Sequence, residues 1–273
     1  MPDQYVIYHR APTHSIPNQL QRNISTRISL LRHHRPISPK AILTVFFVLI
    51  GISVLCHQSG IDEWIAKKFY IMEGGNGHYF PWRDNFWLND VLHEEGRALV
   101  KRLFLLTLGL FLLSWPIHQL ARYRPALLYV VVSTLISTAL ISFLKHHTTI
   151  PCPQSLEEFG GSRHWINIWQ LFESDLPHGS CYPAGHASGG YAWLCLVFLF
   201  PFRSRAFYIA LLPGVLLGLT FGITQQLRGE HFASHDIATI AICWLVSGAI
   251  FHLARRIKDI LNNSSLNYSE YEN

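Results

Sequence analysis

The chain has 273 residues, of which 49% are hydrophobic and only 14% are charged. Soluble domains carry about 25% charged residues, so this composition excludes an ordinary soluble enzyme and favours a protein of the lipid bilayer. The formal net charge is +5, but the basic residues cluster between apolar runs instead of forming one stripe, so we expect no nucleic-acid partner.

The N-terminal 40 residues are polar and strongly basic. They contain a single acid, Asp3, against six cations: Arg10, Arg22, Arg27, Arg32, Arg35 and Lys40. By the positive-inside rule, residues 1–40 are predicted to be a cytoplasmic tail. The first apolar run, 41–56, follows too long a polar lead for a signal peptide and lacks a small-residue cleavage site, so it is interpreted as a retained anchor.

Five further apolar runs predict an all-α integral membrane protein. With the first run they predict a six-helix bundle over residues 41–254; the five lie at 103–117, 126–144, 187–202, 206–227 and 237–253. Several are shorter than the roughly 20 residues that a bilayer requires, so we expect their helices to extend into flanking polar residues. Basic residues follow the second, fourth and last runs, which predicts that both the 1–40 and the 255–273 tails are cytoplasmic and that the active-site loops face outward.

Two of the five cysteines lie in the same predicted outer loop. In an oxidising periplasm, a disulfide between Cys152 and Cys181 would close a loop of about 30 residues and restrain it by about 3 to 4 kcal/mol. This disulfide is a hypothesis at this point. The other three cysteines lie in or at the ends of apolar runs, where a thiol acts as a small hydrophobe.

Three short stretches lie at the outward ends of the apolar runs, and each on its own has a purely structural interpretation. A lysine such as Lys145 can snorkel from a helix end, and Arg228 can anchor a helix at the interface. Together, the stretches gather two cations and two histidines, His186 and His231, at one membrane face. Phosphoryl transfer needs this combination, because fixed positive charge holds the phosphate oxygens while a nucleophile attacks and an acid protonates the leaving oxygen.

The residue types suggest a role for each side chain. Lys145 and Arg228 supply the positive charge, and Gly185, in the turn that opens the fourth run, lets backbone approach phosphate closely. His231 is the predicted nucleophile and His186 the leaving-group acid. The second ring nitrogen of His231 needs a partner, and the two candidates one turn further on are His235 and Asp236.

A metal site is the alternative for the histidine pair. His231 and His235 are four residues apart and would share a helix face, as zinc ligands do in peptidases of the His-Glu-x-x-His kind. That motif needs a glutamate directly after the first histidine, where this chain has Phe232. We therefore expect no metal at this histidine pair.

These stretches resemble the three motifs of the type 2 phosphatidic acid phosphatase superfamily, over roughly residues 126–253. Lys145 and Pro153 are in register with the first motif, but Cys152 stands where the family has arginine. Pro183 to His186 matches the second motif, with Ala184 in place of serine. The resemblance implies that His186 is the general acid.

The third motif departs further from the family pattern. His231 matches the nucleophile, whereas Thr224 and Gln225 occupy the Ser-Arg positions and His235 the acid position. Arg228 lies about one helical turn beyond Gln225, and Asp236 is adjacent to the expected acid. The departures suggest that another cation replaces the arginine lost at Cys152, with Arg97 and Arg163 as the candidates.

The resemblance implies a metal-independent lipid phosphatase of a bacterial cytoplasmic membrane, with no cofactor, a phosphohistidine intermediate and a periplasmic site. Its implied substrates are lipid phosphates: phosphatidate, phosphatidylglycerol phosphate, polyprenyl diphosphate or a phosphorylated outer-membrane lipid of the lipid A type. Two alternatives stay open: a phosphotransferase that passes the phosphoryl group to an acceptor lipid, and a non-catalytic membrane lipid-binding protein.

Overall fold

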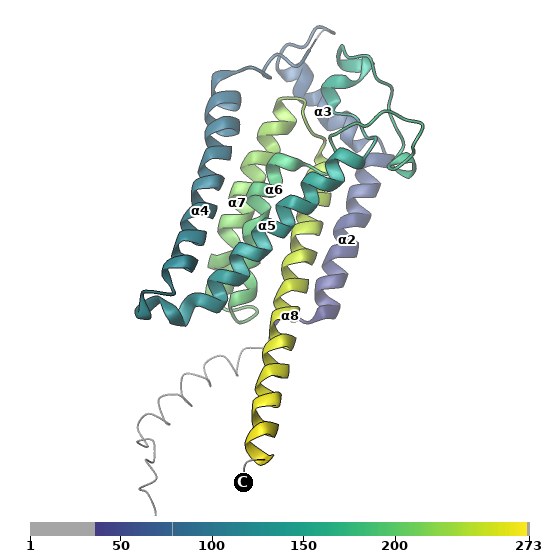
Figure 1. Ribbon diagram of the computed structural model, residues 1–273. Helices are drawn as coiled ribbons and strands as arrows, with labels where there is room; N and C mark the ends of the chain where they lie inside the picture. Colours follow the sequence, from purple (N-terminus) through teal and green to yellow (C-terminus); the bar gives the residue numbers. More distant parts are fainter. Residues whose placement is uncertain (1–35, 78, 272–273) are drawn as a thin grey trace, which may run out of the picture. The chain divides into compact units, whose positions relative to one another are not determined.

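The computed structural model describes residues 36–77 and 79–271, and the side chains among them up to residue 260 (Figure 1). The described part of the chain is all-helical, and its one β-bridge pairs Leu156 with Arg163. The predicted cytoplasmic tail lies outside the described residues as far as residue 35.

Seven α-helices form the body of the described structure. They are α2 (Pro39–Gln58), α3 (Ile61–Met72), α4 (Gly96–Leu113), α5 (Arg124–His147), α6 (Gly185–Tyr191), α7 (Arg205–Leu227) and α8 (Ala233–Tyr271). A π-helix, η1 (Trp87–Glu95), runs directly into α4. Short 3₁₀ segments make up the rest: η2 (His118–Tyr123), η3 (Pro153–Ser155), η4 (Glu157–Phe159), η5 (Ile168–Gln170) and η6 (Ala192–Leu199).

Four helical stretches are long and apolar enough to cross a membrane: 39–58, 118–147, 205–227 and 233–260. They contain four of the six predicted apolar runs. The other two runs, 103–117 and 187–202, fall in α4 and in α6 with η6. The N-terminal half of α4 carries Arg97, Lys101 and Arg102, and α6 is only seven residues long. By length and composition, neither helix qualifies as a membrane span. Six crossings therefore remain a prediction.

Local sequence explains where the spanning helices begin. Ser38 precedes α2, and its Oγ accepts a hydrogen bond from the backbone N–H of Ala41, while Pro39 occupies the first helical position. Ser204 caps α7 in the same way through the N–H of Phe207. Such caps satisfy N–H groups that have no partner within the helix.

Glycines allow α6 to lie directly against α7. A Cβ added at Gly190 would lie 2.3 Å from the backbone nitrogen of Gly218, and one added at Gly218 would lie 2.1 Å from the Tyr191 ring. Small residues are what permit this close approach between helices. The contact holds α6, which bears His186 at its start, beside the C-terminal half of α7.

Candidate active site

A cavity of about 660 Å³ brings the three sequence stretches together. Lys145 enters it from the end of α5, Gly185 and His186 from the start of α6, and Arg228 and His231 from the segment between α7 and α8. Residues that are far apart in the chain thus line one cavity.

The predicted nucleophile, His231, is held at the start of α8. It is only 5% exposed, and its Nδ1 lies 3.5 Å from Nδ1 of His235. Because Nδ1 of His231 faces His235, Nε2 is the ring nitrogen that remains available to react with a ligand in the cavity that His231 lines. The geometry therefore favours His235 as the partner of the nucleophile.

The environment of His231 keeps its ring neutral. Burial, together with the positive charge of Lys145, lowers the pKa of His231 to about 3, against a hydrogen bond with the Cys181 backbone that favours the protonated ring. A neutral imidazole retains the lone pair that nucleophilic attack requires.

Asp236, the other candidate partner, is directed away from His231. Its Oδ2 accepts a hydrogen bond from Nε2 of Gln226 at 2.5 Å, and it packs against Gly222 on α7. Asp236 does not line the cavity. Its contacts give it a role in joining α8 to α7.

His186 can donate a proton only when a bound anion offsets its surroundings, because burial and the neighbouring His93 lower the pKa of its ring to about 3. It lines the cavity, and its Nε2 is buried with no hydrogen-bond partner among the described residues. Beside it, a Cβ added at Gly185 would lie 3.6 Å from Nζ of Lys145. The first two motifs are therefore in contact, and a larger residue at position 185 would crowd the lysine.

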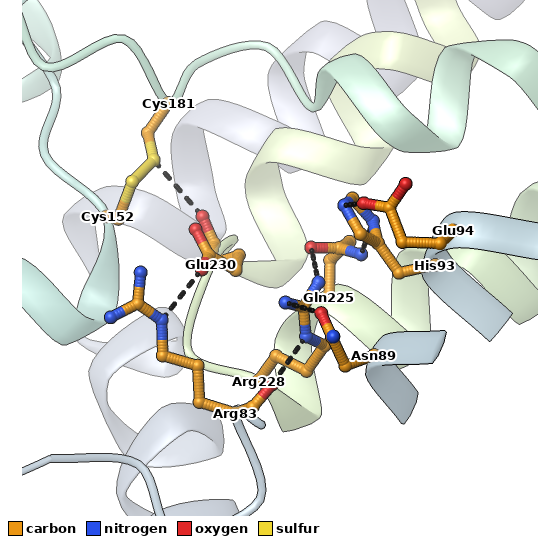
Figure 2. A network of polar contacts seen from close by, with 9 residues as sticks. All are labelled: Arg83, Asn89, His93, Glu94, Cys152, Cys181, Gln225, Arg228 and Glu230. Carbon is orange, nitrogen blue, oxygen red and sulfur yellow. Dashed lines mark hydrogen bonds and ion pairs between the residues drawn. A yellow bond between two sulfur atoms is a disulfide. The ribbon is translucent and has the colours of Figure 1, made fainter. Parts of the chain in front are cut away.

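Arg228 is fixed by three acceptors. Its Nε donates to the Arg83 carbonyl at 2.9 Å, its Nη2 to Oδ1 of Asn89 at 2.8 Å, and its Nη1 to Oε1 of Gln225 at 3.2 Å (Figure 2). The guanidinium thus lies at the side chain of Gln225, the position where the family has its own arginine. Held in this way, its charge is preorganised for an anion.

Sequence reasoning did not assign a role to His93, which lies on η1 and lines the cavity. Nε2 of Gln225 donates to Nδ1 of His93 at 2.8 Å, and the rings of His93 and His186 are 4.5 Å apart (Figure 2 shows the first contact). Burial and the charges of Arg228 and Arg97 lower the pKa of His93 to about 4. The only signal in the sequence was the stretch from His93 to Arg97.

The two candidate replacement cations differ in position. Arg97 lines the cavity, with its Nη1 3.8 Å from Oε2 of Glu94. Arg163 does not line it, because its guanidinium donates to the carbonyls of Pro177 and His178 at 2.6 and 3.0 Å. The geometry therefore supports Arg97 and assigns Arg163 to bracing the outer loop.

Cys152 and Cys181 form a disulfide, with their Cα atoms 5.3 Å apart. Sγ of Cys181 lies 3.1 Å from the carbonyl oxygen of Glu230, next to the nucleophile in sequence (Figure 2). Glu230 also pairs with Arg83 at 3.1 Å. The bridge therefore ties the first-motif region to the turn that carries His231.

Residues 126–259 match the family model of the PAP2 superfamily. This part of the chain belongs to that superfamily, whose members are generally phosphatases or phosphoesterases. No curated protein and no solved structure matches the chain significantly. The matched region contains Lys145, His186, Arg228 and His231, whereas His93 and Arg97 lie outside it.

Proposed function

We propose that this protein is a membrane phosphatase that removes phosphate from lipid phosphate monoesters or diphosphates through a phosphohistidine at His231. The observation that carries the proposal is the single cavity lined by His231, His186, Lys145 and Arg228. These side chains supply a nucleophile, an acid and two fixed cations, which are the parts that metal-free phosphoryl transfer requires.

In the first step, Nε2 of His231 attacks phosphorus. The phosphate enters with a proton that its negative charge allows His186 to hold; the bond between phosphorus and the lipid oxygen then breaks, and His186 gives this proton to that departing oxygen. The ring of His231 becomes cationic, and the contact with Nδ1 of His235 stabilises its remaining N–H. Lys145, Arg228 and Arg97 hold the phosphate oxygens, with Arg97 in place of the arginine that this chain lacks at position 152.

In the second step, His186 takes a proton from water, and the water oxygen attacks the phosphohistidine. The bond between phosphorus and Nε2 breaks, and inorganic phosphate leaves while His231 returns to its neutral form. One histidine thus acts first as acid and then as base, as microscopic reversibility requires.

The proposed location is a bacterial cytoplasmic membrane, with the cavity on the periplasmic side. Four apolar helices support membrane association, and the pattern of basic loops supports this orientation. A disulfide in the loop beside the cavity agrees with an oxidising compartment. The substrate would reach the cavity from the bilayer.

Phosphate release from a panel of lipid phosphates tests the proposal. The full-length protein in detergent should release phosphate from at least one member with chelator present, and the His231→Ala variant should not. Release that chelator abolishes, or that survives in the variant, would contradict the mechanism. Transfer that occurs only when an acceptor lipid is added would identify a phosphotransferase.

A further inference from the structure

The cavity does not end at the proposed catalytic residues. On α5 it is lined by Lys145, Ser142, Thr138 and Thr134 in turn. At about 1.5 Å of rise per residue, the span from Lys145 to Thr134 extends about 16 Å along the helix axis. The site therefore continues as a groove between α5 and α4, with hydroxyl groups on its α5 wall.

The opposite wall carries two cations on one face of α4. Arg97 and Lys101 are four residues apart, and both line the cavity, followed by Phe104. Residues at this spacing lie above one another on a helix. Lys101 lies about 7 Å along the axis from the first residue of α4, and its side chain is exposed where it lines the groove.

Lys101 differs from the neighbouring cations of α4 in having no carboxylate partner among the described residues. Arg97 lies near Glu94, and Arg102 pairs with Glu95 at 3.4 Å. An unpaired charge on a helix within a bilayer is costly and is usually kept for a ligand or an ion path. Lys101 lies about one helical turn beyond Arg97 on the same face of α4.

The charge of the whole cavity points to the kind of ligand. Four cationic side chains line it, namely Arg97, Lys101, Lys145 and Arg228, against one carboxylate, Glu230. That carboxylate is already paired with Arg83. A phosphate monoester carries only about −1.5 to −2 at neutral pH, so the cavity holds more positive charge than one reacting phosphate needs.

We infer that Lys101 forms a second anion subsite that binds the phosphate group between the reacting phosphoryl group and the lipid tail. The proposal rests on the proposed function. The terminal phosphoryl group lies at His231 under Lys145 and Arg228, the next one lies beside Lys101, and the tail continues along the groove past Phe104. The preferred substrate class is accordingly lipid diphosphates over lipid monophosphates.

The test compares kcat/KM for two pairs of substrates that differ by one phosphate: farnesyl diphosphate with farnesyl phosphate, and dioleoylglycerol diphosphate with dioleoyl phosphatidate. For any pair that the full-length wild-type protein hydrolyses, kcat/KM should be about tenfold or more higher for the diphosphate than for the monophosphate, because a charge-assisted hydrogen bond has an effect of this size on rate. In Lys101→Met, kcat/KM for the diphosphate should fall until the preference is lost, while kcat/KM for the monophosphate changes by less than about threefold. Lys101→Arg keeps the positive charge and should keep the preference.

Arg102→Met is the matched control, because Arg102 lies on the same helix but does not line the cavity. This variant should leave kcat/KM unchanged for both the diphosphate and the monophosphate. Equal losses on both members of a pair in Lys101→Met, or a monophosphate preference in the wild type, would overturn the second subsite while leaving the phosphatase intact. Release from no substrate would instead refute the proposed function itself.

Discussion

At the scale of single residues, His235 occupies the place where the superfamily pattern has an acid. Its Nδ1 lies 3.5 Å from that of the nucleophile His231. A neutral imidazole accepts a proton less strongly than a carboxylate, so the pair orients His231 without the full charge stabilisation that an acid would add. The adjacent acid, Asp236, has been redirected to Gln226.

Substitution at these two neighbours should separate their roles. Removing the contact in His235→Leu should lower kcat about 10- to 100-fold, because a hydrogen bond to a charged ring contributes about 1.5 to 3 kcal/mol. His235→Asp should retain or exceed wild-type activity. Asp236→Asn, the matched control, should change kcat by less than about threefold, and a larger loss in Asp236→Asn than in His235→Leu would reverse the assignment.

At the scale of elements, the start of α8 is capped by a residue from another helix. Asp62 on α3 is fully buried, and its Oδ1 accepts a hydrogen bond from the Ser234 N–H at 3.0 Å while its Oδ2 accepts one from the Ser234 hydroxyl. His57 lies 3.4 Å from the same carboxylate. The cap fixes the first turn of α8 and, with it, the position of His231.

Truncating this cap should cost both stability and activity. Asp62→Ala leaves two buried donors of Ser234 without an acceptor and should lower the free energy of unfolding by about 1 to 3 kcal/mol. Thermal unfolding in detergent and kcat would measure the two effects. Asp62→Asn keeps the oxygen that faces the Ser234 N–H and should lose less. If the alanine variant had the wild-type melting temperature, the cap would not hold α8.

At the scale of the whole molecule, the all-helical class and four apolar spanning helices were predictable from the apolar runs, whereas the short α6, which carries His186, does not qualify as a crossing. Lys145, His186, Arg228 and His231 were proposed from their positions at helix ends and line one cavity, while their catalytic roles stay a prediction. The contributions of His93 and Asn89 could not be predicted from the sequence. His93 contacts Gln225 and Asn89 contacts Arg228, and each contact joins residues more than 130 positions apart. No local periodicity records such a contact.

The burial of a neutral histidine makes the stability of the whole protein depend on pH. The pKa of His231 is about 3 in the folded protein, below the ordinary value of about 6.5. As pH falls below 6.5, the unfolded chain binds a proton that the folded protein excludes, so stability falls by up to about 1.4 kcal/mol per pH unit until pH approaches the folded value. His231→Gln should lose less stability than the wild type between pH 6.5 and 4.5, and identical melting curves would contradict this.

The phosphohistidine is the central claim, and trapping it is the most direct test. Protein is mixed with a lipid phosphate bearing ³²P in its terminal group, quenched within the first turnover and digested. We predict a label that is stable to alkali and labile to acid, on the peptide containing His231, and absent from His231→Ala. Label on another residue, or rapid phosphate release with no labelled protein at any time, would contradict the account.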